Sequence, residues 1–305
     1  MPEAHEIWQG DEWQEYSQRL LKHHYGPGSY QEVPDTHSGD LGIEGFSMDG
    51  CAFQCYAVEG LLDTNTTYER QRDKITADIG KFIRNEKELA QMFGTMRISR
   101  WIFMVPDHVS RKLNAHAATK TAEVHAAAPT HTAADFRIVI VTDAHFEVAR
   151  KALVESGAAR VRLVTPTIDE SIVDRWKDQT AHSTLLATMD EKLKKIPRLE
   201  DDAKRSSFAQ MLVRRFLEGQ AFLTSLSENY PMVYARAAEQ KRAQEEMLVT
   251  KSGIGASAAP VFFEEQLNRI REELETSLSN VPPTQIVLLA NEAVADWLMR
   301  CPLDF

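Results

Sequence analysis

Two acidic residues and an amide lie close together in residues 38–57, SGDLGIEGFSMDGCAFQCYA. Asp40 and Glu44 are followed by Gln54, which sits inside an apolar run. A buried charge is costly unless a metal ion, a partner or a reaction compensates for it. Carboxylate and amide oxygens are hard ligands that suit Mg²⁺ or Mn²⁺ better than zinc. A metal ion bound there would activate water and stabilise the extra negative charge of a phosphodiester under attack.

Each of these residues also has a purely structural explanation. Asp40 is equally suited to capping a turn. Gln54 could satisfy its amide by bonding to backbone within the core. For Glu44 the functional explanation is the stronger one, because an unpaired carboxylate in a strand beside Ile43 and close to Phe46 would be costly.

The apolar pattern predicts the elements that would position these side chains. Residues 41–47 and 51–57 are typical of two strands joined by the turn-forming residues 48–50. On adjacent antiparallel strands, Glu44 and Gln54 can project to one face at cross-strand distance. The flanking sequence predicts, in order, a helix over 11–26, a strand over 29–34, an amphipathic helix over 65–85 and a buried strand over 100–106.

Further along, two buried strands are predicted over 136–142 and 159–166, with helices near 108–126 and 144–156 between the strands. Strands that alternate with helices indicate an α/β fold with parallel pairing. After residue 165 the periodicity becomes helical throughout. The sequence therefore predicts two domains, an α/β domain over 1–165 and an all-helical domain over 166–305.

The stretches GDLGIEGF and FQCYA, in this element order, resemble the PD-(D/E)XK restriction-endonuclease-like superfamily, and especially its Mrr-type branch. In that branch a Gly-Asp-x-Gly-x-(Asp/Glu)-Gly stretch is followed by a (Glu/Gln)-x-Lys strand. The residues LLKHHYG and YQEVP resemble the family's first helix and strand. The resemblance covers about residues 11–106 and implies an αβββαβ core; the helical remainder lies outside it.

The resemblance implies a metal site residue by residue. Glu44 matches the strand carboxylate that holds the ion, and Gln54 matches the second ligand, where glutamine often replaces glutamate. Glu15, on the first helix, matches an acidic residue that some members add, and Asp40 either binds the metal or fixes the loop. The strand lysine of the family is replaced by Tyr56, whose phenol, with a pKa near 10, carries no positive charge.

Members of the family tolerate migration of that lysine to the following helix, and Lys74 is the candidate here. The resemblance thus implies a Mg²⁺- or Mn²⁺-dependent DNA endonuclease of restriction or anti-phage defence. The helical domain would serve dimerisation, sensing or binding to a partner protein. The alternative is a catalytically inactive, nuclease-derived module that binds nucleic acid or acts as a scaffold. RNA as the substrate also stays open.

The composition limits the class of protein. A formal charge of −10 argues against a generally basic, DNA-coating protein, although a local basic face suffices for binding. There is no run of eighteen apolar residues, and the acidic start of the chain lacks the pattern of a secretory signal. Together with only three cysteines, this predicts a cytoplasmic protein with reduced thiols and no membrane segment. The histidines, His131 among them, lack metal-ligand spacing and are predicted to lie at the surface.

Overall fold

The computed structural model describes residues 8–34, 41–60, 62–252 and 259–300 of the 305-residue chain. The chain divides into two compact units between Leu153 and Val154. We call residues 8–153 the α/β unit and residues 154–300 the helical unit. Each is described by itself.

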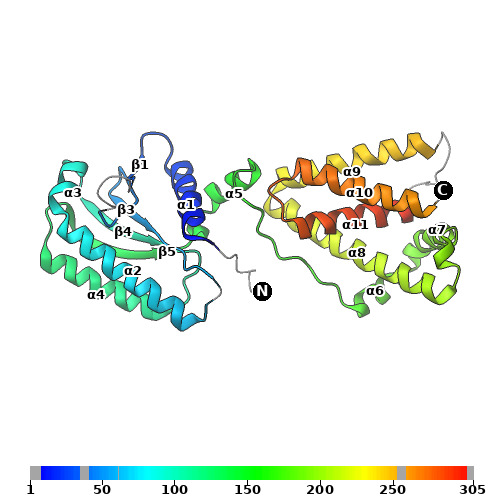
Figure 1. The fold of residues 1–305 in the computed structure, drawn as a ribbon, viewed down its shortest axis with the longest axis horizontal. Helices are drawn as coiled ribbons and strands as arrows, with labels where there is room; N and C mark the ends of the chain where they lie inside the picture. Colours follow the sequence, from blue (N-terminus) through cyan, green and yellow to red (C-terminus); the bar gives the residue numbers. More distant parts are fainter. Residues whose placement is uncertain (1–7, 35–40, 61, 253–258, 301–305) are drawn as a thin grey trace. The chain divides into compact units, whose positions relative to one another are not determined.

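The α/β unit is built on one five-stranded mixed sheet, with strand order β1-β2-β3-β4-β5 (Figure 1). Strands β1 to β3 pair antiparallel, whereas β3, β4 and β5 are parallel. In chain order its elements are α1 (Gly10–Tyr25), β1 (Tyr30–Glu32), β2 (Gly45–Ser47), β3 (Cys51–Cys55), α2 (Thr64–Arg84), α3 (Glu86–Phe93), β4 (Ile98–Met104), α4 (Arg111–Ala127), β5 (Thr132–Val141), a 3-10 turn (Asp143–Phe146) and α5 (Glu147–Glu155).

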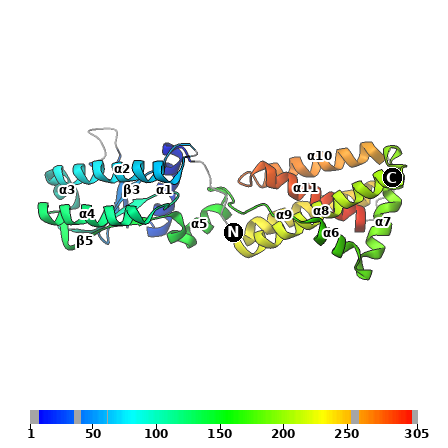
Figure 2. The same ribbon diagram turned by 90° about the horizontal axis from the view of Figure 1, so that it is seen from below.

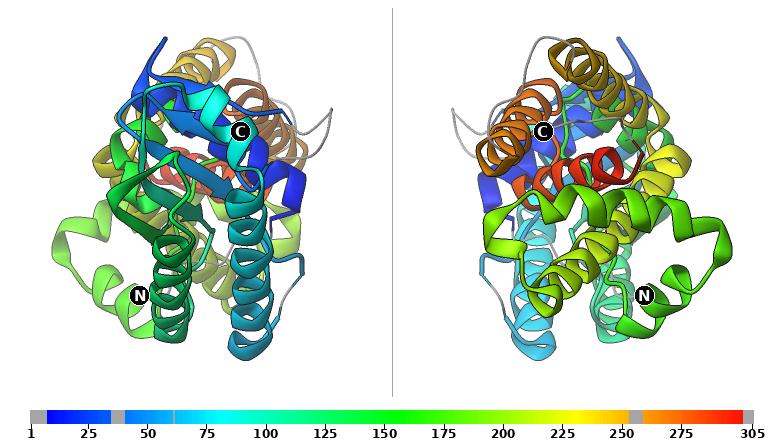
Figure 3. Two further views of the ribbon diagram at one scale, coloured as in Figure 1. Left: turned by 90° about the vertical axis from the view of Figure 1, so that its left-hand side faces the viewer. Right: turned by 90° about the vertical axis from the view of Figure 1, so that its right-hand side faces the viewer.

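Helices α2 and α4 run side by side and cover one face of the sheet (Figures 1 and 3). Asp63 begins α2 by accepting hydrogen bonds from the backbone N–H groups of Asn65 and Thr66. The apolar side chains of α2 recur at helical spacing and are buried against β4 and β5. The buried residues that carry this packing are Ile75, Ile79, Phe82, Trp101, Phe103, Leu113, Ala117 and Phe136.

The α/β class is confirmed, and the order α1, β1, β2, β3, α2, β4 is the expected αβββαβ order with the short helix α3 inserted. The strand predicted over 41–47 is shorter than expected. Leu41 and Gly42 have φ angles of 52° and 83°, which no regular strand adopts, and β2 begins only at Gly45.

The strand predicted over 159–166 is wrong. These residues form no strand, and they belong to the helical unit instead of to the sheet. The Val161 N–H donates to the backbone oxygen of Asn280, and the side chain of Gln285 donates to the Leu163 oxygen. Because Asn280 and Gln285 satisfy this backbone, the division falls after Leu153 rather than near residue 165.

The helical unit contains α6 (Glu170–Lys177), α7 (Ser183–Lys194), α8 (Asp202–Asn229), α9 (Pro231–Ser252), α10 (Ala259–Ser277) and α11 (Pro283–Arg300). Four of them close a ring of neighbours, in which α8 packs on α9, α9 on α10, α10 on α11 and α11 on α8 (Figure 2). Among the described residues, every helix is too short or too polar to traverse a lipid bilayer.

Residues 264–278 and 285–299 carry more apolar surface than a short isolated helix pair could hide within itself, which predicts self-association of the helical domain. In the structure, further helices of the same unit cover this surface. Helix α11 is buried along most of its length against α7, α8 and α10, and Ile270, Leu274 and Leu278 of α10 are buried as well. Dimerisation therefore stays a prediction without support from these faces.

His131 is fully buried, which makes the prediction of a surface histidine wrong. Its ring meets Phe82 edge-on at 4.5 Å between centroids, and neither ring nitrogen has a hydrogen-bond partner. Burial lowers the pKa of His131 from 6.5 to about 4. The neutral imidazole thus acts as an apolar core residue.

This burial predicts acid sensitivity of the α/β unit. The unfolded chain binds the His131 proton below pH 6.5, whereas the folded unit binds it only near pH 4. The free energy of unfolding should therefore be intact above pH 6.5 and should fall by about 2 kcal/mol from this group between pH 7 and pH 5. Urea titrations at both pH values should show that His131→Leu abolishes most of this loss. A loss of equal size in His131→Leu and in the exposed control His23→Gln would contradict the prediction.

Candidate functional site

A cavity of about 390 Å³ lies at the C-terminal end of β3, in the α/β unit. We call it the strand-end cavity. It is bounded by the first turns of α1, the residue that precedes β2, the segment that follows β3 and the first half of α2. Its lining residues are Gly10, Asp11, Gln14, Glu44, Cys55, Tyr56, Ala57, Glu59, Arg70 and Lys74.

Glu44 is fixed in place by its backbone on both sides. Its N–H donates to the Phe53 oxygen at 2.7 Å, and its own oxygen accepts from the Val33 N–H at 2.8 Å and from Gln18 Nε2 at 3.0 Å. Because β2 and β3 pair Gly45 with Phe53, the next position places Glu44 opposite Gln54. The predicted cross-strand meeting of Glu44 and Gln54 is therefore what the structure shows.

Glu44 is 7% exposed, and its carboxylate accepts hydrogen bonds from Gln54 and Cys55. Gln54 Nε2 donates to its Oε1 at 2.6 Å, and the Cys55 N–H donates to its Oε2 at 3.3 Å. Burial and the neighbouring Glu44 charge raise the pKa of Cys55 well above its ordinary value, so the thiol beside Glu44 is neutral and unreactive.

Gly42 allows the backbone conformation that places Glu44 at the strand-end cavity. Its φ is 83°, and a Cβ there would lie 2.3 Å from the backbone oxygen of Asp78 in α2. The Gly42 oxygen accepts from Trp101 Nε1 at 3.0 Å. The segment before β2 is therefore held tightly between α2 and β4, in a conformation that a side chain would prevent.

One property of Gln54 suits the role of a metal ligand. The side chain is fully buried, and its Oε1 has no hydrogen-bond partner, which is costly for an amide oxygen. With the amide turned over, this oxygen would face the Glu44 carboxylate, an arrangement that only a cation or a proton between them would favour. Mg²⁺ keeps several waters and needs only one or two protein carboxylates, so Glu44 and Gln54 are a sufficient protein contribution.

Two further predicted ligands are not placed at the cavity. Asp40 lies outside the described residues. Glu15 does not line the strand-end cavity: its side chain is 67% exposed and forms an ion pair with Arg19. Asp11 and Gln14, three residues apart on the same helix, face the cavity instead, since neighbouring helical residues point about 100° apart. In the described residues no group of three His, Cys, Asp or Glu side chains could hold a metal ion.

Lys74 lines the strand-end cavity together with Glu44, as the migrated-lysine hypothesis requires. Its Nζ lies 2.9 Å from Oδ2 of Asp78 and 6.0 Å from the centroid of the Tyr56 ring. Asp78 is 1% exposed and also pairs with Lys81, at 3.2 Å. Asp78 therefore anchors the ammonium group of Lys74 at the edge of the cavity.

Sequence reasoning missed a second cation. Arg70 is one helical turn before Lys74 and lines the same cavity. The signal was available, since side chains four residues apart on a helix share one face. Tyr56 supplies no positive charge, because a phenol is neutral or anionic, and burial raises its pKa so that it stays neutral. The strand-end cavity is thus lined by two basic side chains and by Glu44, whose carboxylate accepts a hydrogen bond from the buried Gln54.

Comparison with protein-family models, with curated proteins and with solved structures finds no match for this chain. The assignment of a function accordingly depends on the motif, the element order and the geometry of the strand-end cavity.

Proposed function

We propose that the α/β unit is a metal-dependent DNA endonuclease of the PD-(D/E)XK type, acting in the cytoplasm in restriction or anti-phage defence. The observation that carries the proposal is Glu44, whose carboxylate accepts from the buried Gln54 and which lines the same cavity as Lys74 and Arg70. Acidic and amide oxygens suit a cation, and two basic side chains suit the phosphate that it would share. Stability alone does not account for this combination.

Each side chain has a distinct role in this proposal. Glu44 and Gln54 would hold Mg²⁺ or Mn²⁺, which supplies Lewis acidity and an activated water when bound. Lys74 would orient that water and offset charge that develops on the phosphate. Arg70, with a planar guanidinium, suits bidentate contact to a phosphate oxygen pair and would position the DNA backbone.

The alternative is a nuclease-derived module that binds nucleic acid or acts as a scaffold subunit without cutting. Two observations favour it: Tyr56 replaces the strand lysine, and Gln54 uses its amide nitrogen, not its oxygen, toward Glu44. In that case Lys74 and Arg70 would serve binding only. Dimerisation and a partner protein of a defence system belong to both proposals.

One experiment separates the two proposals. Purified full chain should convert supercoiled plasmid to nicked or linear DNA in Mg²⁺ or Mn²⁺, and EDTA should stop the conversion, because Glu44 and Gln54 alone supply no positive charge for the reaction. A single-stranded RNA of matched length serves as the second substrate and tests the choice of nucleic acid. DNA binding without cleavage under every metal condition would favour the inactive alternative. The absence of both binding and cleavage would exclude the nuclease and any nucleic-acid-binding module, and would leave only a scaffold subunit.

A further inference from the structure

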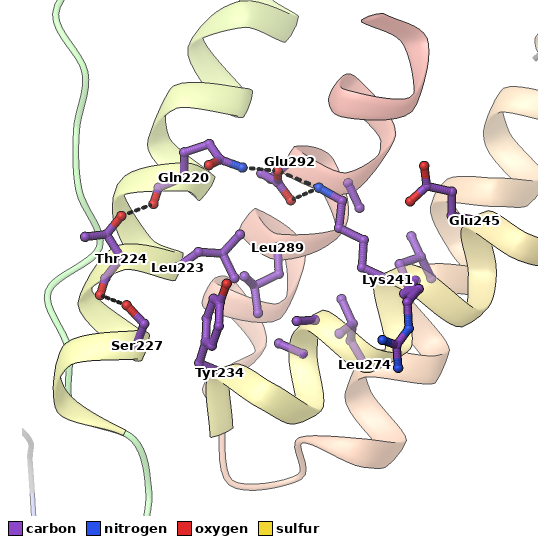
Figure 4. A pocket seen from close by; sticks show the side chains of 15 residues that line it. Gln220, Leu223, Thr224, Ser227, Tyr234, Lys241, Glu245, Leu274, Leu289 and Glu292 are labelled. Atoms are coloured by element: carbon purple, nitrogen blue, oxygen red, sulfur yellow. Dashed lines mark hydrogen bonds and ion pairs between the residues drawn. The ribbon is translucent and has the colours of Figure 1, made fainter. Parts of the chain in front are cut away.

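A second cavity, of about 290 Å³, lies in the helical unit between α8, α9, α10 and α11 (Figure 4). We call it the helical cavity. One part of its wall is apolar, formed by Leu223, Ile270, Leu274 and Leu289 together with the ring of Tyr234. The remaining lining residues are Gln220, Thr224, Ser227, Ala237, Ala238, Lys241, Arg242, Glu245, Glu292 and Ala293.

A charged network is buried at this cavity. Glu292 is 1% exposed, and its carboxylate accepts from Gln220 Nε2 at 2.6 Å and from Lys241 Nζ at 2.8 and 3.1 Å. Lys241 also pairs with Asp296 at 2.9 Å, and Arg300 contacts the other oxygen of Asp296. A buried ion pair is often no better for stability than apolar residues of the same volume. Stability therefore gives no sufficient reason for this network.

The packing places Glu292 deep in the unit. A Cβ at Gly219 of α8 would lie 2.2 Å from the Cβ of Glu292, so only glycine lets α8 and α11 approach this closely. Burial raises the pKa of Glu292 above its ordinary value, although Lys241 and Gln220 oppose this effect. An added positive charge beside the carboxylate would therefore be favourable.

Three donor side chains at the helical cavity already have partners. The Thr224 hydroxyl donates to the Gln220 oxygen at 3.0 Å, and the Ser227 hydroxyl donates to the Thr224 oxygen at 2.8 Å. The three donors of Lys241 face the two carboxylates just described. The oxygens of these hydroxyl and carboxylate groups keep acceptor capacity, so this part of the polar wall offers acceptors.

Glu245 adds a further carboxylate to the lining of the helical cavity. It is half-buried, lines the helical cavity, and forms no ion pair with any other residue that the structure describes. Arg242, the remaining basic residue of the lining, is exposed at the surface. A ligand that reaches the interior therefore meets carboxylate and hydroxyl oxygens on one side and apolar side chains on the other.

We propose that the helical cavity binds a small organic amine or amidine. Its cationic head donates hydrogen bonds to Glu245 and Glu292, and its apolar or aromatic body lies against Leu223, Leu289 and Tyr234. The proposal is independent of the nuclease proposal, because it concerns residues of the helical unit alone.

The test is a pair of ligands with the same body and opposite heads, titrated into the full chain by calorimetry. Phenethylamine should bind at least about ten-fold more tightly than 3-phenylpropionate, since a charge-assisted hydrogen bond contributes on the order of a factor of ten or more. Equal affinities, tighter binding of the carboxylate, or no binding of phenethylamine at concentrations up to about 10 mM would overturn the proposal.

Variants locate the site. Glu245→Gln removes the partially exposed carboxylate without touching the buried network, so the fold is kept and the affinity for phenethylamine should fall about ten-fold. Glu272→Gln, an exposed glutamate of α10 outside the lining, is the matched control and should bind as the parent does. Undiminished binding by Glu245→Gln would exclude this cavity as the amine site.

Discussion

Glu44→Gln is expected to abolish metal-dependent cleavage, with a loss on the order of 10³-fold or more, while the protein stays folded. The substitution removes the carboxylate to which Gln54 donates and so the negative charge that a divalent cation needs. It keeps an oxygen that can accept from Gln54 Nε2, so the pairing of β2 and β3 is preserved. Plasmid cleavage and thermal unfolding should be measured on the same preparations.

Matched variants make this result specific. Glu123→Gln changes the charge equally on the exposed surface of α4 and should cut as the parent does. Gln54→Ala should lose most activity, because it removes the second oxygen ligand and leaves a void beside Glu44. Glu15→Gln should keep near-parental activity, since Glu15 faces solvent and pairs with Arg19. If Glu44→Gln retains parental activity, the site assignment is wrong.

The parts of the site that could be predicted are those fixed by local sequence. The turn at residues 48–50 sets the register of β2 and β3, and this register brings Glu44 opposite Gln54 whatever the rest of the chain does. The start of α2 is likewise local, because Asp63 caps it. In the same way Lys74 could be placed at the border of the buried face from helical spacing alone.

The features that sequence reasoning missed depend on tertiary contacts. Residues 159–166 have the composition of a buried strand, but Asn280 and Gln285, distant in sequence and within the same helical unit, satisfy part of their backbone. His131 is polar in sequence, yet it fills an aromatic pocket beside Phe82. Glu15 shares a helix with cavity-lining residues but faces away from them, a difference of one position that a resemblance cannot resolve.

The position of Asp78 in the sequence already predicts its ion pairs with Lys74 and Lys81. It lies four residues after Lys74 and three before Lys81, the spacings at which helical side chains meet. A carboxylate at this point of an apolar helical face is buried, so it needs both ammonium groups. Burial of Asp78 therefore fixes the position of the Lys74 ammonium group at the edge of the strand-end cavity.

Lys74→Met is expected to slow cleavage on the order of 10²-fold, with little change in DNA affinity. Methionine keeps the apolar stem but removes the charge that would stabilise the phosphate in the transition state. Lys74→Arg should restore only part of the rate, because a planar guanidinium does not replace a compact ammonium. Single-turnover cleavage and binding in Ca²⁺ should be measured separately, so that a loss in rate is not confused with a loss in binding.

The shared carboxylate supplies the control that distinguishes catalysis from folding. Lys81→Met removes the other partner of Asp78 but does not line the strand-end cavity, so its rate should stay within about three-fold of the parent. Asp78→Asn frees Lys74 from its anchor and should slow cleavage less than Lys74→Met does. If Asp78 acts only through Lys74, the double variant Asp78→Asn, Lys74→Met should be no slower than Lys74→Met alone. Additive losses, or parental rates in Lys74→Met, would show that this lysine does not serve the reaction.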